Sequence, residues 1–524
     1  MNNYKNKAWS IFAGIIFAFT TLVTVGLLVK VAGLNMLPGK YFGLAVFAVV
    51  FLLLIIFAFA FLLPWKRKKE TSESSSQQKN ALKKNIGKYV LRAIALLLAI
   101  LLMIVDVVGV RMIDKFEETM SNLVENEEEK VEEFVFGVYV LVDDKAETIE
   151  DAKRYDFGYS LGYDRNNTQK AIGVLEEALN RSLNLEEYNA ISDMIDAVLA
   201  GEKDAFILNA AYLDILREQE GYADLLDKVK CIHEWVVTTQ TEVADRLEDA
   251  FDITKDTFVV YVSGHDTDYA ASRANSDVNI MAVVNPTTKQ VLLVNTPRDF
   301  FVPISVSEEG ALDKLTHCGI YGVECSMDTL DAFYDVDIKY YAQLNFKGFV
   351  RLIDAVGGIS VYCEKYIDTG DGYIFKKGMN YFNGDQALRF VRERKQFGDG
   401  DHARGRHQMA VIEGLIQKMS SGSLLRNYGD IMDSMGKYFK CSLSQEEISA
   451  LVKMQLTDMS EWNVQSYAVT GTGSKSTCYS LKNLKTYVMI PDEASVEHAK
   501  TLIQMVYDGE TIEDEDLKVP ATEE

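Results

Sequence analysis

The sequence predicts a membrane-anchored chain of mixed α/β (α+β) class. At 524 residues it is too long for one ordinary hydrophobic core, and about three structural units are expected. Three long apolar runs stand at the amino terminus, and strand-like and helix-like segments alternate after them. We therefore expect three N-terminal transmembrane helices, a small α/β accessory domain, and a larger domain with a mixed central β-sheet flanked by helices.

The apolar runs cover residues 9–29, 41–63 and 90–110, and each is long enough to cross a bilayer as a helix of about 20 residues. A cleaved signal peptide is the alternative for the first run. No clear small-residue cleavage site precedes Pro38, however, and two further runs follow. Residues 1–110 are therefore predicted to form a membrane domain in contact with the lipid bilayer.

Charge predicts the orientation of this membrane domain. The loop 65–89 is rich in lysine, and the positive-inside rule puts it, with the amino terminus, in the cytoplasm. The protein is thus expected to be a multi-pass protein of the cell membrane, with everything after residue 110 extracellular. The whole chain has a formal net charge of -23, but residues 1–110 hold thirteen basic residues against three acidic ones. The remainder is therefore strongly acidic, and we expect no nucleic-acid partner.

All six cysteines lie in the predicted extracellular part. An even number in an oxidising compartment permits disulfides, but six cysteines allow fifteen connectivities and the sequence does not choose among them. No two form a CxxC pair, so we do not expect them to bind a metal. These cysteines are Cys231, Cys318, Cys325, Cys363, Cys441 and Cys478.

After the third span, residues 111–133 form a charged, helix-favouring stalk. Residues 134–250 alternate apolar strands, such as "FVFGVYVLV", with helical stretches such as "TQKAIGVLEEALN". This pattern is typical of a small α/β domain, and it contains no obvious catalytic constellation. Residues 251–427 form the larger domain, and residues 428–524 are expected to form a C-terminal α/β extension with an acidic tail.

A β-hairpin is predicted in the larger domain, where "NIMAVV" and "QVLLVNT" flank the turn "NPTTK". If the loop is residues 286–289, Asn285 faces Gln290 and the same register places Asp277 opposite Arg298. The simpler interpretation is a surface salt bridge, worth at most about 1 kcal/mol. Further along, "LIDAVGGISVYC" reads as helix, glycine turn and strand, and "NGDQALRF" as a helix with an asparagine cap.

Five arginines gather in "RFVRERKQFGDGDHARGRHQ", residues 389–408. If 390–394 is extended, Arg392 and Arg394 share one face. If 403–419 is helical, Arg404 and Gln408 share a face and Arg406 points elsewhere. Guanidinium groups bind phosphate bidentately, so this cluster indicates a phosphate site, whereas the alternative is a solvated basic face that touches lipid headgroups.

Two carboxylates complete the predicted phosphate chemistry. Asp266 and Asp277 flank a polar loop and could hold Mg²⁺, which bridges phosphate oxygens. Arginines together with magnesium carboxylates are the equipment of phosphoryl transfer. "DKLTHCGIYG" adds Lys314 and His317 within one helical turn, although a histidine there is more often structural.

Four blocks between about residues 258 and 420 resemble the LytR-CpsA-Psr family of cell-wall enzymes: "SGHDTDYAASRANSDVNIMAVVNPTTKQVLLVNTPRDFFVPI", "DKLTHCGIYG", "YYAQLNFKGFVRLIDAVGGISVY" and "MNYFNGDQALRFVRERKQFGDGDHARGRHQMAVI". The resemblance implies an extracytoplasmic phosphotransferase with an apolar pocket for a prenyl chain. Such an enzyme moves a glycopolymer (capsular polysaccharide, teichoic acid or similar) from a polyprenyl-pyrophosphate carrier to peptidoglycan. The three spans and the accessory domain resemble those of the streptococcal capsule-type members.

The resemblance also implies roles for individual residues. Mg²⁺ or Mn²⁺ would be held by Asp266 and Asp277, and Asp299 would orient its own turn. The catalytic residues would be arginines that grip the pyrophosphate, with Asp401 ordering Arg404; these arginines are Arg298, Arg392, Arg394 and Arg404. The pyrophosphate and the lipid would also be bound by Arg273, Lys314, His317 and Gln408. Three positions depart from the usual pattern, since Asn275 replaces an arginine, Cys318 an alanine and His407 an asparagine.

Two alternatives remain open from the sequence. The same site could serve a pyrophosphatase of lipid carriers, with water as the nucleophile, because both reactions need the same electrophilic centre. The chain could instead be a non-catalytic membrane regulator of envelope polymer synthesis. The general base is not assigned, and a carboxylate such as Asp299 is one candidate.

Overall fold

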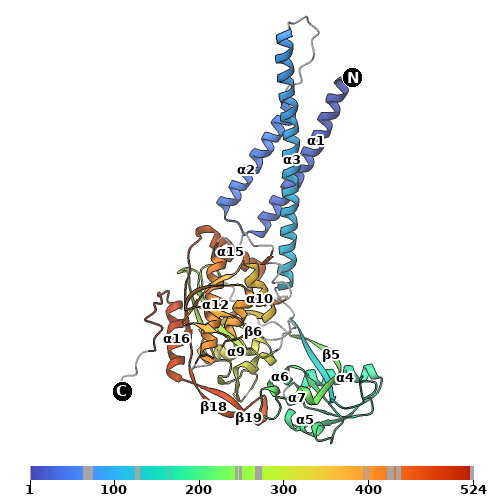
Figure 1. Ribbon diagram of the computed structural model, residues 1–524, viewed down its shortest axis with the longest axis vertical. Coiled ribbons are helices and arrows are strands. Elements are labelled where there is room, and N and C mark those ends of the chain that lie inside the picture. The colour runs from blue at the N-terminus through green and yellow to red at the C-terminus, as the bar shows by residue number, and fades with distance from the viewer. Residues whose placement is uncertain are drawn as a thin grey trace. The chain divides into compact units, whose positions relative to one another are not determined.

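The structure is a computed structural model of the chain (Figure 1). It describes residues 2–62, 75–123, 130–162, 164–241, 246, 251–265, 274–307, 309–393, 396–397, 401–421, 430–431 and 438–519. The described residues divide into two compact units. One contains residues 1–121 and 444–459, and the other contains the rest.

The first unit is helical, as the apolar runs predict. Its three long helices are α1 (Asn2–Leu34), α2 (Gly39–Phe57), which continues into η1 (Ala58–Leu62), and α3 (Ser75–Leu123). Each contains a segment long and apolar enough to cross a membrane, namely Ile11–Leu34, Gly39–Leu62 and Val90–Met120. The third helix runs without a break into the expected stalk, so most of 111–123 extends the span. In this unit Thr24 of α1 donates a hydrogen bond to the buried carboxylate of Asp106 in α3.

A further short helix, α15 (Gln445–Asp458), belongs to the same unit. It begins with a capping box, in which Ser444 accepts from the backbone of Glu447 and Glu447 accepts in return. Lys453 Nζ donates to Asn35 Oδ1 at 2.8 Å, and Lys40 Nζ donates to the Thr457 carbonyl at 2.7 Å. These bonds tie α15 to the turn between α1 and α2.

The second unit begins with the accessory domain, whose sheet has the order β3-β2-β4-β1-β5. The first strand starts at Lys130, four residues before the expected boundary. The strands are β1 (Lys130–Leu141), β2 (Asp156–Tyr159), β3 (Asn184–Glu187), β4 (Ala205–Asn209) and β5 (Val229–Thr241), and the helices are α4 (Arg165–Leu179), α5 (Ile191–Leu199), α6 (Ala211–Arg217) and α7 (Leu225–Lys228).

The larger domain is built on a six-stranded mixed sheet with the order β16-β11-β6-β7-β8-β17. Two neighbouring pairs, β6 with β11 and β8 with β17, are parallel, and the others are antiparallel. The strands are β6 (Phe258–His265), β7 (Val278–Asn285), β8 (Gln290–Asn295), β11 (Ile338–Asn345), β16 (Phe439–Cys441) and β17 (Asn463–Ala468). Both edge strands come from the segment 428–524, so this segment completes the central sheet rather than extending the domain.

Helices cover both faces of this sheet. On one face α9 (Val323–Tyr334) and α16 (Glu493–Tyr507) pack over a core that includes Tyr261 and Met281. On the other face lie α10 (Phe346–Ala355), α11 (Gly384–Val391) and α12 (Asp401–Ser420). Because strand side chains alternate, Val262 and Gly264 of β6 face these last helices. The expected mixed sheet flanked by helices is confirmed.

Shorter elements complete the unit. The antiparallel ribbon of β18 (Gly471–Cys478) and β19 (Leu481–Pro491) lies against accessory helix α5 (Figure 1). After α10, Gly357 and Gly358 adopt positive φ values of 80° and 83°, which form the predicted glycine turn into β12. The remaining elements are β9 (Phe301–Pro303), β10 (Leu312–Lys314), α8 (Leu315–Cys318), η2 (Gly319–Tyr321), β12 (Ile359–Cys363), β13 (Ile367–Asp368), β14 (Ile374–Phe375) and β15 (Gly378–Phe382). All six cysteines are free thiols in this structure.

Candidate active site

A cavity of about 480 Å³ lies between the central sheet and the helices α10 and α12. This volume is typical of a site for a small ligand. Most of its wall is apolar: Val262, Val278, Ala342, Leu344, Phe346, Phe349, Leu352, Val391, Val411, Ile412, Leu415 and Phe439. The polar side chains on the wall are Asp277, Arg298, Asn345, Arg392, Arg404 and Gln408. The cavity therefore combines an apolar lining with three guanidinium groups.

Helix α12 supplies two of the polar side chains, as its predicted spacing requires. Arg404 and Gln408 both line the cavity, one turn apart. Arg406 points away and bonds Glu364 at 3.1 Å between Nη2 and Oε1. Arg389, at the end of α11, pairs instead with Asp371 at 2.7 Å. The helix therefore sorts the arginine cluster into residues that face the cavity and residues that do not.

Arg392 reaches the cavity by a different route from the one expected. The extended conformation predicted for 390–394 is wrong at its start, because Phe390 and Val391 end helix α11 and Arg392 is its C-cap. The helix forms because Asn383 opens it with a capping box and its apolar side chains are buried. The Arg392 guanidinium lies 4.3 Å from the centroid of the Phe346 ring, a cation–π contact that orients it on the cavity wall.

Arg298 and Asp277 form the ion pair that the hairpin register predicts. Asn285 pairs with Gln290 as expected, and Arg298 Nη1 lies 2.5 Å from Asp277 Oδ1. The other side of the guanidinium contacts Glu218 of the accessory domain, at 3.0 Å between Nη2 and Oε1. Burial by itself would lower the pKa of Arg298, but these carboxylates together with Asp299 raise it above its usual value. The guanidinium is therefore permanently charged.

Asp299 is buried beside Arg298 and pairs with Lys314, at 2.7 Å between Oδ1 and Nζ. Burial by itself would raise the pKa of this carboxyl, but Lys314 and Arg298 outweigh burial and lower it. A carboxylate with a lowered pKa and a fixed lysine partner is a poor proton acceptor. The geometry thus favours the expected orienting role of Asp299 and disfavours its use as the general base.

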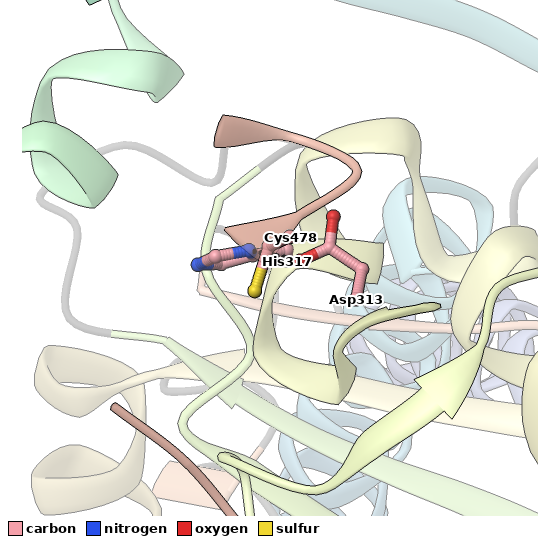
Figure 2. Close-up of side chains that lie close together, drawn as sticks. All are labelled: Asp313, His317 and Cys478. Atoms are coloured by element: carbon pink, nitrogen blue, oxygen red, sulfur yellow. Dashed lines mark hydrogen bonds and ion pairs between the residues drawn. The ribbon is translucent and has the colours of Figure 1, made fainter. Parts of the chain in front are cut away.

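Lys314 and His317 do not line the cavity, contrary to expectation. Lys314 is directed to Asp299, and His317 Nδ1 bonds Asp313 Oδ1 at 2.6 Å inside a buried cluster (Figure 2). Asp313 is on strand β10 and His317 is on the short helix α8 that follows it, and the bond between them keeps the imidazole in the buried cluster rather than on the cavity wall. The position of His317 thus favours the structural alternative over substrate binding.

Asp313, His317 and Cys478 are the one group of three potential metal ligands among the residues that the structure describes (Figure 2). Both oxygens of Asp313 already accept hydrogen bonds. Oδ1 accepts from the Lys314 backbone and His317, and Oδ2 accepts from the backbone and hydroxyl of Ser480. The cluster therefore does not fit a metal ion, and it ties the Asp313 strand to the β18–β19 ribbon.

Three predicted site residues lie outside the described residues, and for a fourth only the backbone is described. The three are Asp266, Arg273 and Arg394, and the fourth is Asp401. Of the two predicted magnesium ligands, the structure therefore describes only Asp277. Its side chain is 22% exposed and lies on the cavity wall.

Sequence reasoning missed three residues that shape the site. Asn345 caps α10 by accepting from the Gly348 backbone at 2.8 Å, and it also lines the cavity. Its position after a strand and before an amphipathic helix is a signal that could have found it. The contact of Phe346 with Arg392 and that of Glu218 with Arg298 join segments far apart in the chain, and no local pattern marks them.

His407, on α12 beside the site, predicts a pH dependence of stability. It packs against Phe390 and Phe397, and burial lowers its pKa to about 4. The pKa of histidine in the unfolded chain is about 6.5, so below this pH the unfolded state binds a proton that the folded state does not. The free energy of unfolding therefore decreases as the pH falls from about 6.5 to 4. Replacing His407 by phenylalanine should remove about 1–2 kcal/mol of this loss between pH 7 and pH 5. Thermal unfolding of the detergent-solubilised chain at both pH values measures it, and equal losses in variant and wild type would contradict it.

The cavity as a whole suits an amphiphilic anion, that is, an apolar chain joined to phosphate groups. Its apolar wall can exclude water from the chain, and the three arginines can bind phosphate oxygens bidentately. An α/β domain with this cavity, joined to apolar helices long enough to span a membrane, is typical of proteins that bind lipid-linked phosphates. The chain belongs to the LytR-CpsA-Psr family, because the profile of the LytR_cpsA_psr family matches residues 228–502, just over half of the chain.

Curated relatives carry one recurring name, polyisoprenyl-teichoic acid–peptidoglycan teichoic acid transferase TagU. The chain is 37% identical over 182 residues to the protein of this name from Bacillus cereus (strain AH820), which covers 34% of the chain and 59% of the relative. It is 35% identical over 200 residues to the protein from Enterococcus faecalis (strain ATCC 700802 / V583), covering 38% and 65%. The matched segment thus spans less than two thirds of each of these relatives.

Among solved structures, the chain matches TagV of B. subtilis with 25% identity and a TM-score of 0.41 over 49% of this chain and 99% of that one. Another, described as TagT bound to LI-WTA, has 26% identity and a TM-score of 0.40 over 49% and 94%.

Proposed function

We propose that this chain is an extracytoplasmic phosphotransferase that moves a glycopolymer from a polyprenyl-pyrophosphate carrier to peptidoglycan. The observation that carries the proposal is the single cavity in which Arg298, Arg392 and Arg404 share a wall with twelve apolar side chains. The names of the TagU relatives and the family membership support the same reaction. We place the cavity outside the cell, on the basis of the basic loop 65–89.

In this reaction a hydroxyl oxygen of peptidoglycan attacks the phosphorus that bears the polymer. The bond from that phosphorus to the bridging oxygen breaks, the lipid leaves as the polyprenyl monophosphate, and the hydroxyl loses its proton. Arg298, Arg392 and Arg404 stabilise the negative charge that develops on the phosphate oxygens. Gln408 can donate a hydrogen bond to the same oxygens, and the apolar wall holds the prenyl chain.

We further propose that Mg²⁺ or Mn²⁺ binds at Asp277. The carboxylate lies on the cavity wall, and although Arg298 Nη1 contacts its Oδ1, a carboxylate has two oxygens and can ligate an ion through the other. A bound divalent ion would neutralise phosphate charge. Glycopolymer, peptidoglycan and the bilayer are the proposed partners, and nucleic acid is not among them.

Replacing Asp277 by asparagine should weaken Mn²⁺ binding to the full chain by at least about 10-fold, because the variant loses a charged oxygen ligand. Electron paramagnetic resonance of Mn²⁺ in detergent measures this without any turnover. Asp371→Asn is the matched control, since Asp371 also pairs with an arginine but lies away from the cavity. Equal Mn²⁺ affinity in Asp277→Asn and wild type would refute the proposed metal position.

A transfer assay tests the function itself. The full chain, reconstituted in liposomes, is given radiolabelled polymer on a polyprenyl-pyrophosphate lipid, with and without peptidoglycan. We expect label on peptidoglycan and little release without it. Equal release of free polymer phosphate in both conditions would show the alternative pyrophosphatase, and no release in either would show a non-catalytic protein.

A further inference from the structure

The accessory domain delivers a carboxylate to the candidate active site. Helix α6 ends at its C-cap residue, Glu218. The Glu218 carboxylate lies 3.0 Å from Arg298 Nη2 through Oε1 and 3.5 Å from Lys314 Nζ through Oε2. Arg298 is on the cavity wall and is 80 residues further along the chain. An accessory residue and a cavity residue are thus in direct hydrogen-bond contact.

This contact is held by a shared hydrophobic core. Tyr212, Leu213 and Leu216 of α6 are buried in one cluster with Ile320 and Leu481 of the larger domain. The core fixes α6 against the larger domain, because close-packed side chains leave little freedom to slide. Glu218 therefore stands at the end of a packed helix, where its carboxylate has a defined position.

The charges around Arg298 explain what such a carboxylate can do. Asp277 binds Nη1 and Glu218 binds Nη2, so the guanidinium is held from both sides. A guanidinium has five N–H donors, and these two bonds orient it while leaving further donors for a ligand. Lys314, which is almost fully buried, sits between Glu218 and Asp299 and balances their charge. Without these partners the Arg298 side chain would be mobile, and ordering it in each turnover would cost conformational entropy.

We propose that Glu218 is a positioning residue that orients Arg298 for the reaction, and that the accessory domain is by this contact part of the active site. The inference rests on the proposed transferase function. It assigns a task to the accessory domain, namely to present one carboxylate to the arginine that contacts the diphosphate.

Replacing Glu218 by glutamine in the full chain tests this role. The charge-assisted bond to Arg298 is lost, so we expect kcat for polymer transfer to fall by about 10-fold. KM should stay the same or fall, because removing a negative charge does not weaken the attraction of the site for a diphosphate. Glu220→Gln is the matched control, since Glu220 is two residues away and its side chain is 97% exposed; it should behave as wild type.

The outcomes separate the two hypotheses. A fall in kcat at unchanged or lower KM, with the melting temperature retained, supports the role of Glu218. Wild-type kcat in Glu218→Gln overturns it while leaving the transferase proposal intact, and so does a raised KM at unchanged kcat. A wild-type chain that transfers no polymer overturns the transferase proposal and this inference with it. If Glu218→Gln unfolds, Glu218→Ala is assayed in its place for kcat, KM and melting temperature, and wild-type kcat in that variant overturns the positioning role.

Discussion

Replacement of Arg404 by lysine is expected to lower kcat for polymer transfer by about 100-fold. The guanidinium of Arg404 lies on the cavity wall with Arg298 and Arg392. A lysine keeps the positive charge but cannot bind two phosphate oxygens in a planar, bidentate manner. Because that geometry matters most when charge develops on the transferred phosphate, kcat should fall more than KM rises. Steady-state kinetics of the reconstituted chain measure both constants.

Helix α12 itself offers the control for this experiment. Arg406 is two residues further along, and its guanidinium bonds Glu364 outside the cavity lining. Arg406→Lys makes the same chemical change on the same helix and should retain wild-type kcat. If Arg404→Lys and Arg406→Lys lost activity equally, the loss would reflect total positive charge rather than the cavity, and the assignment of Arg404 would be wrong.

Filling the cavity should separate recognition of the lipid chain from recognition of the phosphates. Leu415 of α12 lies on the apolar wall, and Leu415→Trp would place a larger side chain in the space proposed for the prenyl chain. If the indole displaces three methylene groups, at about 0.8 kcal/mol each, kcat/KM for a long-chain substrate falls by about 50-fold. Kinetics with substrates of long and short prenyl chains measure the effect, and the short-chain substrate should lose much less.

Gln417 provides the matched position for this second substitution. It is exposed on the same helix and bonds Glu413 at 3.0 Å, so Gln417→Trp adds the same indole away from the cavity. This control should use long-chain substrate as wild type does. Equal losses for long and short substrates in Leu415→Trp would show that the cavity does not hold the chain. The melting temperature of each variant distinguishes this result from a folding defect.

Local patterns predicted those parts of the site that depend on neighbouring residues. The turn at residues 286–289 fixes the pairing of Asn285 with Gln290, because loop length sets the register of a hairpin. The ladder ends at Ile280 and Asn295, and just beyond it the side chains of Asp277 and Arg298 meet in the expected ion pair. In the same way, the period of a helix placed Arg404 and Gln408 on one face of α12 and Arg406 on another.

The predictions for Arg392 and His317 were wrong because other contacts determine the backbone conformation at Arg392 and the position of the His317 side chain. Arg392 was expected on a strand, but the Asn383 capping box and the buried face of α11 extend the helix up to it. His317 was expected in the cavity, but Asp313 holds it in a buried cluster with Cys478 and Ser480, which are more than 150 residues away. For Arg392 the asparagine cap was a local signal that favoured the helix, whereas nothing near His317 in the sequence marks its contact with the distant ribbon.

Local sequence patterns are enough to predict the membrane helices, the mixed α/β class, the hairpin and the sorting of arginines on α12, because each depends on hydrophobic period, turn length or charge within a short stretch. The tertiary structure alone decided that β16 and β17 complete the central sheet, that Arg392 stacks on Phe346, and that Glu218 holds Arg298. These are contacts between segments far apart in the chain. They arise only when the packing of buried side chains fixes how sheets and helices meet, and a linear pattern does not encode that geometry.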